Sequence, residues 1–598
     1  MKIKYVDGKR LARAIHAGAQ RIFQRTDHLN EINFFPVPDA DTGSNISSTF
    51  QSIVNKLSTD SQTCVKNTSK IAANAALIGA HGNSGVIFAQ FFYGLYQEME
   101  DCRALTTEKF GSAVKNSVNY VYNALSEPKD GTIISVIRDW ANGVYKHSKT
   151  KQDFVELWHH GMQIAKKSLE DTRERFESQA VEVVDAGAQG FVDFLDGIYK
   201  FISRGKIKEL TNQLDRIPDF TAEVDDHVVE KMEDIKYRYC TEFLFKNCQL
   251  DTQGLKTKLK NFGDSIVIAG ASEISRIHIH TDVPHKVMRS ISQISSEIIE
   301  QKVDDMKMQY IDSNTRHSDI ALVTDTAANL PQKLIDKYNI HVIPFNVIFG
   351  QDKFLDTLTI DNKQFYNKMK KRNAQARTSQ PSPAHFRKMY SSLLKHYKKI
   401  ISIHLAGTVS GAYQAAKSSA SEFGDRIKVI DSKNITVSEG LLVLQIAKMI
   451  RGGKNIDEII NKIDNIRNNL QLFVSVPDVD TLMRSGRVSK AKGLLAKLLK
   501  IKPIITLDES GLPVRSDKAF TRAGLETKLI NYMDQYLQDK RNCKFMVAHV
   551  NSPETAEHYA EYIRNNYNQE DVEIVHGAPV LASHTGLGTA AIGVYWEE

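Results

Sequence analysis

Two acidic residues and a run of small polar residues stand together in FPVPDADTGSN, residues 35–45 of the 598-residue chain. Each proline favours an extended conformation in the residue before it, so the segment presents Asp39 and Asp41 from a stiff lead-in. These carboxylates are suited to Mg²⁺, which takes hard oxygen ligands and completes its shell with substrate phosphates. The helical pattern that follows offers unpaired N–H groups to an anion. A capped surface turn is the competing interpretation, because turns use the same residue types.

Three further loops rich in small residues follow in the same region: GAHGNSGV at 79–86, PKDGT at 128–132 and VDAGAQG at 184–190. Each of them leads into an apolar helical pattern. Glycine lets the backbone approach a phosphate closely. Helix caps would explain single residues such as Gly79 and Ser84, but not whole clusters. The four loops together favour a metal–phosphate site.

A second group of chemically competent residues lies near the middle of the chain. The alternation in RIHIHTD places His278 and His280 on one face of a strand. Cys240 lies in another strand-like run, YRYCTEFLF. One cysteine and two histidines suit Zn²⁺, with water or a further ligand as the fourth donor. A buried cysteine beside two half-exposed histidines is the alternative, and the pattern alone favours it.

The elements that must position these residues divide the chain into three regions. Residues 1–205 show apolar positions at a spacing of three to four and predict helices, whereas residues 206–312 predict a small α+β domain. In the latter, the stretch at 284–301 reads as helix. Residues 313–598 alternate strand and helix patterns, which predicts a two-lobed α/β domain with largely parallel pairing. Small hydroxyl residues follow its strands, where open α/β sheets bind ligands.

Composition narrows the class of protein. The net charge of +7 is small for this length and is spread along the chain, which argues against a nucleic-acid surface. Five cysteines lie far apart, as expected in a reducing cytoplasm. The N-terminal stretch is too charged for a signal peptide. No apolar run approaches ~20 residues, so the sequence predicts no transmembrane segment.

The four loops resemble, in order and spacing, the nucleotide-binding domain of the DhaL (DAK2) kinase family. The resemblance implies an all-α bundle in which Asp39 and Asp41 hold a pair of Mg²⁺ ions against the phosphates of ATP. Asn33 stands near the place of a third acidic ligand. The implied nucleotide contacts are Asn33, Thr42, Gly43, Ser44, Asn45, Gly82, Asn83, Ser84, Gly131 and Thr132.

The rest of the chain resembles two further families. The segment around Cys240, His278 and His280 is similar to the middle domain of bacterial fatty acid kinases, which implies that these three residues bind zinc. The C-terminal loops RTSQPS at 377–382, HLAGTVSGA at 404–412 and SHTGLGT at 583–589 together resemble the DegV family, whose members enclose one fatty acid. Ala406 and Gly407 stand where paired serines are common in that family. The implied contacts to the fatty acid carboxyl group are Thr378, Ser379, Thr408, Ser410, Arg487 and His584, with Arg484 in the same segment as Arg487.

These resemblances together imply a fused fatty acid kinase: ATP and a long-chain fatty acid give acyl phosphate and ADP, with Mg²⁺ and Zn²⁺ as cofactors. Because the two halves are linked in one chain, each meets the other at a roughly millimolar effective concentration, and no docking between separate proteins is needed. Asp39→Asn is expected to abolish transfer and to leave lipid binding intact. Implied partners are an acyltransferase that receives the product, a second copy in a homodimer, and a membrane surface contacted transiently. Two alternatives stay open: a lipid-binding sensor with a regulatory nucleotide site, and a kinase for a small ketone or polyol such as dihydroxyacetone.

Overall fold

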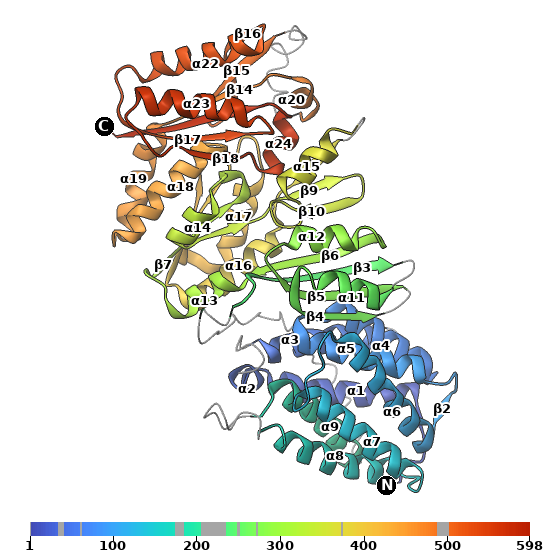
Figure 1. The fold of residues 1–598 in the computed structure, drawn as a ribbon. Coiled ribbons are helices and arrows are strands. Elements are labelled where there is room, and N and C mark those ends of the chain that lie inside the picture. Colours follow the sequence, from blue (N-terminus) through green and yellow to red (C-terminus); the bar gives the residue numbers. More distant parts are fainter. Residues whose placement is uncertain are drawn as a thin grey trace. The chain divides into compact units, whose positions relative to one another are not determined.

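The computed structural model describes residues 2–33, 41–59, 63–173, 184–204, 232, 235–247, 251–270, 273–371, 375–486 and 501–597. Asp39 and Arg487 therefore lie outside the described residues. The chain divides into two compact units, Met1–Ser313 and Asn314–Glu598 (Figure 1). Within the described residues, no helix combines the length and the apolar character needed to cross a membrane.

The first unit begins with a helical bundle, as the three-to-four spacing predicts. Consecutive long helices pack against each other along the chain, and α1 packs against α9 to close the ring. Phenylalanine rings fill the interior, with Phe50 5.2 Å from Phe88 and 4.8 Å from Phe194 between ring centroids. The long helices among the described residues are α1 (Gly8–Phe23), α3 (Thr42–Thr59), α4 (Val65–Gly79), α5 (Gly82–Glu98), α6 (Thr107–Ala124), α7 (Ile133–Ser148), α8 (Phe154–Glu170) and α9 (Ala186–Arg204).

The remainder of the first unit is a four-stranded antiparallel sheet in the order β4-β5-β3-β6. Strands β4 and β5 lie against α5, and β5 also lies against α4, so the sheet packs directly on the bundle. Its elements are β3 (Tyr239–Asn247), α11 (Thr252–Leu259), β4 (Gly263–Gly270), β5 (Ile274–Thr281), α12 (Pro284–Ile291), β6 (Ser295–Asp305) and α13 (Met306–Asn314).

The helix that the sequence predicts over 284–301 is wrong in its second half. Helix α12 ends at Ile291, and the residues from Ser295 onward form strand β6. Strand β6 pairs with β3 along the whole length of β3, from Tyr239 to Asn247. This long-range pairing outweighs the local helical pattern, because strand preference depends strongly on the neighbouring strands.

The second unit contains three sheets. A parallel sheet has the order β13-β12-β7-β8, and a small antiparallel sheet has the order β10-β9-β11. The largest sheet has the order β16-β15-β14-β19-β17-β18. The strands are β7 (Ile320–Asp325), β8 (Ile340–Ile343), β9 (Asn346–Phe349), β10 (Asp352–Leu355), β11 (Ala376–Ser379), β12 (Lys399–His404), β13 (Ile427–Asp431), β14 (Leu470–Ser475), β15 (Lys502–Leu507), β16 (Pro513–Ala519), β17 (Arg541–His549), β18 (Glu573–His576) and β19 (Ala590–Glu597).

The expectation of largely parallel pairing holds for only one lobe of this unit. In the largest sheet, β17 and β18 are parallel, whereas β19 runs antiparallel to both β14 and β17. An apolar strand pattern carries no information on strand direction, which explains the error. Helix α18 (Thr436–Arg451) joins the lobes, because it packs against β14, β17 and β19 and also against β7.

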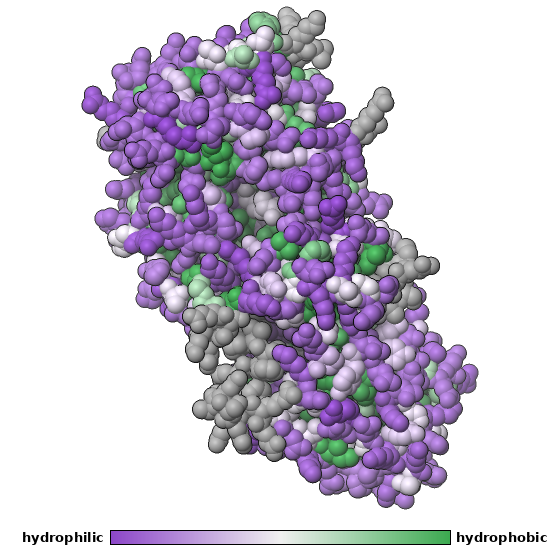
Figure 2. Space-filling model, viewed as in Figure 1, coloured by the Kyte–Doolittle hydropathy of each residue, from purple (hydrophilic) through white to green (hydrophobic). Residues whose placement is uncertain are grey.

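Hydrophobic side chains are concentrated inside these units. Separate buried clusters fill the helical bundle and the space around α18. The face seen in Figure 2 is mostly hydrophilic, with scattered hydrophobic residues. The polar side chains that are buried despite this arrangement therefore mark the places where function can be sought.

Candidate functional site

Four helix starts meet at one polar cavity of about 420 Å³ in the first unit. Helices α3, α5, α7 and α9 begin there, immediately after or within the four small-residue loops. Helix N-termini carry unpaired N–H groups and a positive partial charge, so their convergence favours a polyanion. The lining residues from these starts are Asn33, Asp41, Thr42, Asn45, Gly82, Asn83, Ser84, Thr132, Ile133, Asp185 and Gly187.

The first loop is fixed to α2 (Thr26–Glu31) by side-chain hydrogen bonds. Asn30 donates to the hydroxyl of Ser44 at 3.0 Å, and its carbonyl oxygen accepts from the Ser44 N–H at 3.1 Å. Asp41, at the entry to α3, is 5% exposed and lines the cavity. Asp41, Thr42 and Asn45 line the cavity, whereas Ser44 and Gly43 contact α2 instead.

The second loop requires glycine at Gly82. Its φ angle is +60°, and an added Cβ atom would collide with the side-chain amide of Asn45. The loop therefore brings the start of α5 into direct contact with the start of α3. The side-chain oxygen Oδ1 of Asn83 is buried and has no hydrogen-bond partner among the described residues. A buried orphan acceptor at a cavity wall fits a site that takes a ligand.

The third and fourth loops are joined by Asp185. Its carboxylate accepts from the Ile133 N–H at 3.1 Å and from the Ala188 N–H at 2.7 Å, so it holds the starts of α7 and α9 together. Sequence reasoning missed Asp185 as a site residue, although an aspartate before a helix start is a signal for an N-cap. Thr132 lies at the N-cap of α7, and its hydroxyl donates to the Lys129 carbonyl at 2.8 Å.

The middle sheet supplies the opposite wall of the same cavity. Cys240 and Glu242 on β3 face His280 and His278 on β5, in directly paired positions. On the other side, Lys302 of β6 pairs with Glu242. The sulfur of Cys240 and one ring nitrogen of each histidine lie within 4.8 Å of one another, and all three residues are buried. The structure thus brings together the three residues that the sequence proposes as zinc ligands.

The hydrogen bonding and burial of these three residues are consistent with a metal-binding site. Nε2 of His278 is buried and has no hydrogen-bond partner among the described residues. Nδ1 of the same ring lies 3.3 Å from a carboxylate oxygen of Glu242, which can only accept. A metal-binding histidine typically donates its second ring N–H to a carboxylate in this way. Burial raises the pKa of the Cys240 thiol well above its usual range, so the thiolate needs a bound cation to persist.

Glu242 is the acidic centre of this wall and was missed by sequence reasoning. It is 1% exposed, and burial alone would raise its pKa. Lys302, His278 and His81 instead hold the pKa of the carboxyl group well below its usual range. Arg276, which is fully buried, adds an ion pair at 3.1 Å. The carboxylate therefore stays ionised inside the protein.

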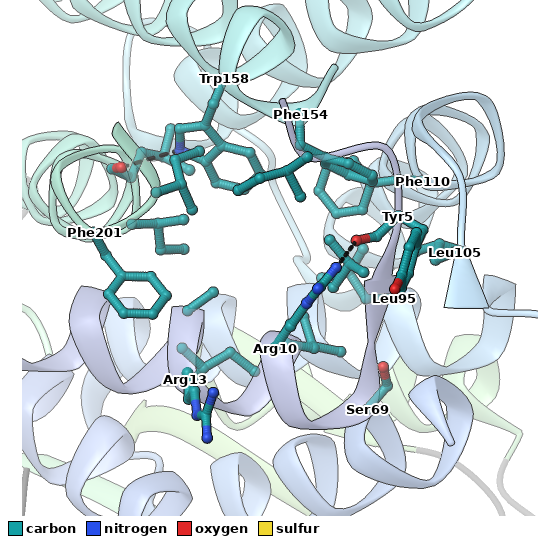
Figure 3. A pocket seen from close by; sticks show the side chains of 18 of the residues that line it. Tyr5, Arg10, Arg13, Ser69, Leu95, Leu105, Phe110, Phe154, Trp158 and Phe201 are labelled. Atoms are coloured by element: carbon teal, nitrogen blue, oxygen red, sulfur yellow. Dashed lines mark hydrogen bonds between the residues drawn. The ribbon is translucent and has the colours of Figure 1, made fainter. Parts of the chain in front are cut away.

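A second cavity in the helical bundle is apolar and has a volume of about 470 Å³. Figure 3 shows rings of Phe110, Phe154, Trp158 and Phe201 around it, and Arg10 donating to the Tyr5 carbonyl oxygen at 2.9 Å. It shares no lining residue with the polar cavity. Of these two cavities, the polar one alone is lined by the helix starts that would suit a phosphate.

In the second unit, two of the residues predicted to bind a carboxyl group contact each other. The hydroxyl of Thr378 on β11 lies 2.9 Å from Nε2 of His584 on α24 (Pro579–Thr585). Ser379 is exposed, as is Thr408. Ser410 accepts from the Ala412 N–H at 3.2 Å at the start of α17 (Ala412–Ala420).

An apolar cavity of about 90 Å³ lies beside α24 in the second unit. Leu581 and Thr585 of α24 border it, together with Val474 of β14 and Ile505 of β15. Asn329 and Thr436, joined by a 2.7 Å hydrogen bond, border it as well. The volume is well below the ~300 Å³ at the lower end for ligand pockets, so a whole acyl chain requires the walls to move.

Comparison with protein families assigns a type to each region. Residues 36–200 match the DAK2 domain. Residues 236–313 match the FakA-like middle domain, a domain type described from fatty acid kinases. Residues 319–597 match the DegV family, described as uncharacterised. The three domain types therefore follow one another in one chain.

Individual relatives cover only part of the chain. Uncharacterized proteins of Staphylococcus saprophyticus and Staphylococcus epidermidis are 32% and 31% identical over 313 residues, which is 52% of this chain and 56% of each relative. The chain thus spans about half the length of these curated relatives. Among solved structures, the fatty acid binding protein DegV of Bacillus subtilis is 28% identical with a TM-score of 0.44, covering 47% of this chain and 100% of that one. A fatty acid binding DegV family protein of Streptococcus agalactiae is 26% identical with a TM-score of 0.44, covering 47% and 99%.

Proposed function

We propose that this protein transfers the γ-phosphoryl group of ATP to the carboxylate of a fatty acid held by its own C-terminal half. The observation that carries the proposal is the convergence of four helix starts and Asp41 on one polar cavity. The succession of DAK2, fatty acid kinase-like and DegV domains supports a fatty acid as the acceptor.

The residues of the cavity suit this reaction. A fatty carboxylate is already ionised at neutral pH, so no strong general base is needed. Transfer then depends on positioning and on neutralising phosphate charge. The N–H groups at the helix starts stabilise the phosphates, with Thr42, Asn45, Asn83, Ser84 and Thr132 as nucleotide contacts. Mg²⁺ held by Asp39 and Asp41 would supply further neutralisation of the phosphate oxygens.

The remaining site residues have distinct proposed roles. Cys240, His278 and His280 would hold Zn²⁺, which would link β3 to β5 at the cavity wall. Thr378 and His584 hold the fatty acid carboxyl group, with Ser379, Thr408, Ser410 and Arg487 as further contacts. The proposal extends to a cytoplasmic homodimer that contacts membranes transiently and passes acyl phosphate to an acyltransferase.

Two other functions make different predictions. A lipid-binding sensor would bind nucleotide without turnover. A kinase for a small ketone or polyol would phosphorylate dihydroxyacetone and carry no lipid. The presence of a DegV region argues against the second alternative, because a polyol kinase needs no fatty acid site.

The decisive experiment supplies the full chain with Mg²⁺, labelled ATP and oleate or palmitate, and traps acyl phosphate with hydroxylamine. Wild type is expected to form product, and Asp41→Asn is expected to lose at least ~100-fold in rate, since it removes a charge needed at the phosphates. Asp27→Asn is the matched control, because Asp27 is exposed on α2 and does not line the cavity. Absence of product from wild type with lipid still bound would refute the proposal and favour the sensor.

A further inference from the structure

The connection between α4 and α5 is held from outside the helical bundle by two buried side chains of the middle sheet. Arg276 donates to the carbonyl oxygens of Leu77 and Ile78, at 3.0 and 2.7 Å. Glu242 accepts from the Gly82 N–H at 2.7 Å and from Nδ1 of His81 at 3.0 Å. The sheet therefore contacts the end of α4, the connecting residues and the first residue of α5.

The hydrogen bond to Gly82 determines which donors remain for a ligand. Gly82 is the first residue of α5, so its N–H is one of the groups that have no partner within the helix. The Glu242 carboxylate accepts the hydrogen bond from this N–H, so the N–H is not available to a ligand. Asn83 and Ser84 line the polar cavity immediately after it. The carboxylate thereby sets the position of the helix start that faces the proposed phosphates.

The same carboxylate also contacts the metal cluster. Oε1 of Glu242 accepts both from Gly82 and from Nδ1 of His278, the latter at 3.3 Å. A metal ion held by His278 would fix the orientation of the ring whose Nδ1 lies beside the Glu242 carboxylate. Glu242 is thus shared between the proposed zinc site and the proposed nucleotide site.

Burial makes this arrangement rigid. Glu242 and Arg276 are 1% and 0% exposed, so neither side chain can exchange its partners for water. Loss of one partner would leave a buried charge uncompensated, which is strongly unfavourable. Arg276 has a second acidic partner, Glu300 at 2.9 Å, whose side chain is 41% exposed and which lies on β6 at the far side of β3 from β5.

We propose that Glu242 is a positioning residue that couples metal binding at Cys240, His278 and His280 to nucleotide binding at the start of α5. The inference rests on the proposed function, because it takes the polar cavity as the nucleotide site. It adds a regulatory link: the metal fixes the His278 ring beside Glu242 and, through Glu242, the start of α5, so loss of the metal weakens nucleotide binding without abolishing it.

The test measures binding of Mg²⁺–ADP to the full chain, loaded with zinc or stripped by a chelator that is then removed. Wild type is expected to bind Mg²⁺–ADP ~10-fold more weakly without zinc. Linkage then requires Mg²⁺–ADP to raise the affinity for zinc by the same factor, which a competing metal indicator measures without any turnover.

Glu242→Gln is the informative variant, because glutamine keeps the shape and removes the charge. It is expected to bind one zinc with an affinity reduced ~10-fold or more, and to bind Mg²⁺–ADP weakly whether or not zinc is present. Glu300→Gln is the matched control, since it also removes a carboxylate from Arg276 but keeps Glu242 on Gly82 and His81. It is expected to keep the wild-type coupling.

A spectroscopic signal distinguishes positioning from general destabilisation. With Co²⁺ in place of zinc, Mg²⁺–ADP is expected to shift the visible absorption of wild type and Glu300→Gln, but not that of Glu242→Gln. If Glu242→Gln fails to fold, His81→Gln removes one hydrogen bond from a partly exposed residue and is expected to reduce the coupling factor.

Three results would overturn the inference: equal nucleotide affinity with and without zinc in wild type, unchanged coupling in Glu242→Gln, or no zinc binding by the chain. Failure of wild type to bind Mg²⁺–ADP at all would overturn the proposed function together with it. Nucleotide binding that is independent of zinc would leave the proposed function standing and remove only the link through Glu242.

Discussion

At the scale of single residues, Asp356 shows how burial controls charge. It is fully buried, and its carboxylate accepts from Thr326 at 2.7 Å and from the Val580 N–H at 3.2 Å. Burial raises its pKa from 3.8 to about 7, and Asp325 adds to this effect. Because the folded state favours the protonated form of Asp356, the contribution of this residue to stability is fully present below pH 3.8. That contribution is lost as the pH rises toward 7.

Asp356→Asn is therefore expected to remove this pH dependence. The difference in unfolding free energy, wild type minus variant, should fall by about 4 kcal/mol at most between pH 4 and 7, since one pKa unit corresponds to about 1.4 kcal/mol. This difference can be measured by unfolding both proteins in denaturant at each pH and following hydrogen exchange in peptides that contain β7. A difference that is constant across this range would contradict the predicted pKa.

His584 permits a second prediction at this scale. If its imidazole and the Thr378 hydroxyl hold a fatty acid carboxylate, His584→Ala should weaken fatty acid binding ~10-fold or more, because a hydrogen bond to a charged group contributes about 1.5–3 kcal/mol. Displacement of a fluorescent fatty acid would measure the change. Asp41→Asn is the control, since this substitution lies in the other unit and should leave the affinity for fatty acid unchanged.

At the scale of elements, the start of α5 depends on a single backbone conformation. Gly82→Ala places a methyl group against the Asn45 amide at a φ angle of +60°. Both the strain and the collision shift the starts of α3 and α5 apart. We expect Mg²⁺–ADP binding to fall ~10-fold or more, measured by calorimetry on the full chain. Gly453→Ala is the control, because Gly453 also has positive φ but no neighbouring atom within 4 Å.

The sequence predicted the helical bundle and the four loops well, because both signals are local. Helix α5 follows directly from its apolar spacing. That its glycine-rich start binds a ligand stays a prediction. The grouping of Cys240 with His278 and His280 was also proposed correctly, since alternation along a strand fixes which side chains share a face. Their roles in binding stay predictions.

The predictions from the sequence were wrong or incomplete where contacts between distant parts of the chain determine the structure. Strand β6 was predicted as helix because its pairing with β3 is invisible in a local pattern. The antiparallel partners of β19 were missed for the same reason. Glu242 and Arg276 could not be identified as site residues, because their importance comes from contacts with residues more than 150 positions away.

At the scale of the whole molecule, the two units are linked in one chain, and each contains one of the two proposed substrate sites. A covalent link gives roughly millimolar effective concentration, far above the micromolar concentration of other chains in an assay. We therefore expect each chain to phosphorylate the fatty acid held by its own C-terminal unit, so that the turnover per chain does not change on dilution.

Mixing two impaired variants tests this expectation directly, at a fatty acid concentration too low to fill the weakened site of His584→Ala. Asp41→Asn has an intact fatty acid site, and His584→Ala has an intact nucleotide site. Transfer within one chain predicts that an equimolar mixture at micromolar concentration shows less than ~10% of wild-type acyl phosphate formation, because the intact sites are on different chains. Recovery of a quarter or more of the wild-type rate would show instead that a dimer exchanges the two units. The tether would then act mainly to bring the two chains of that dimer together.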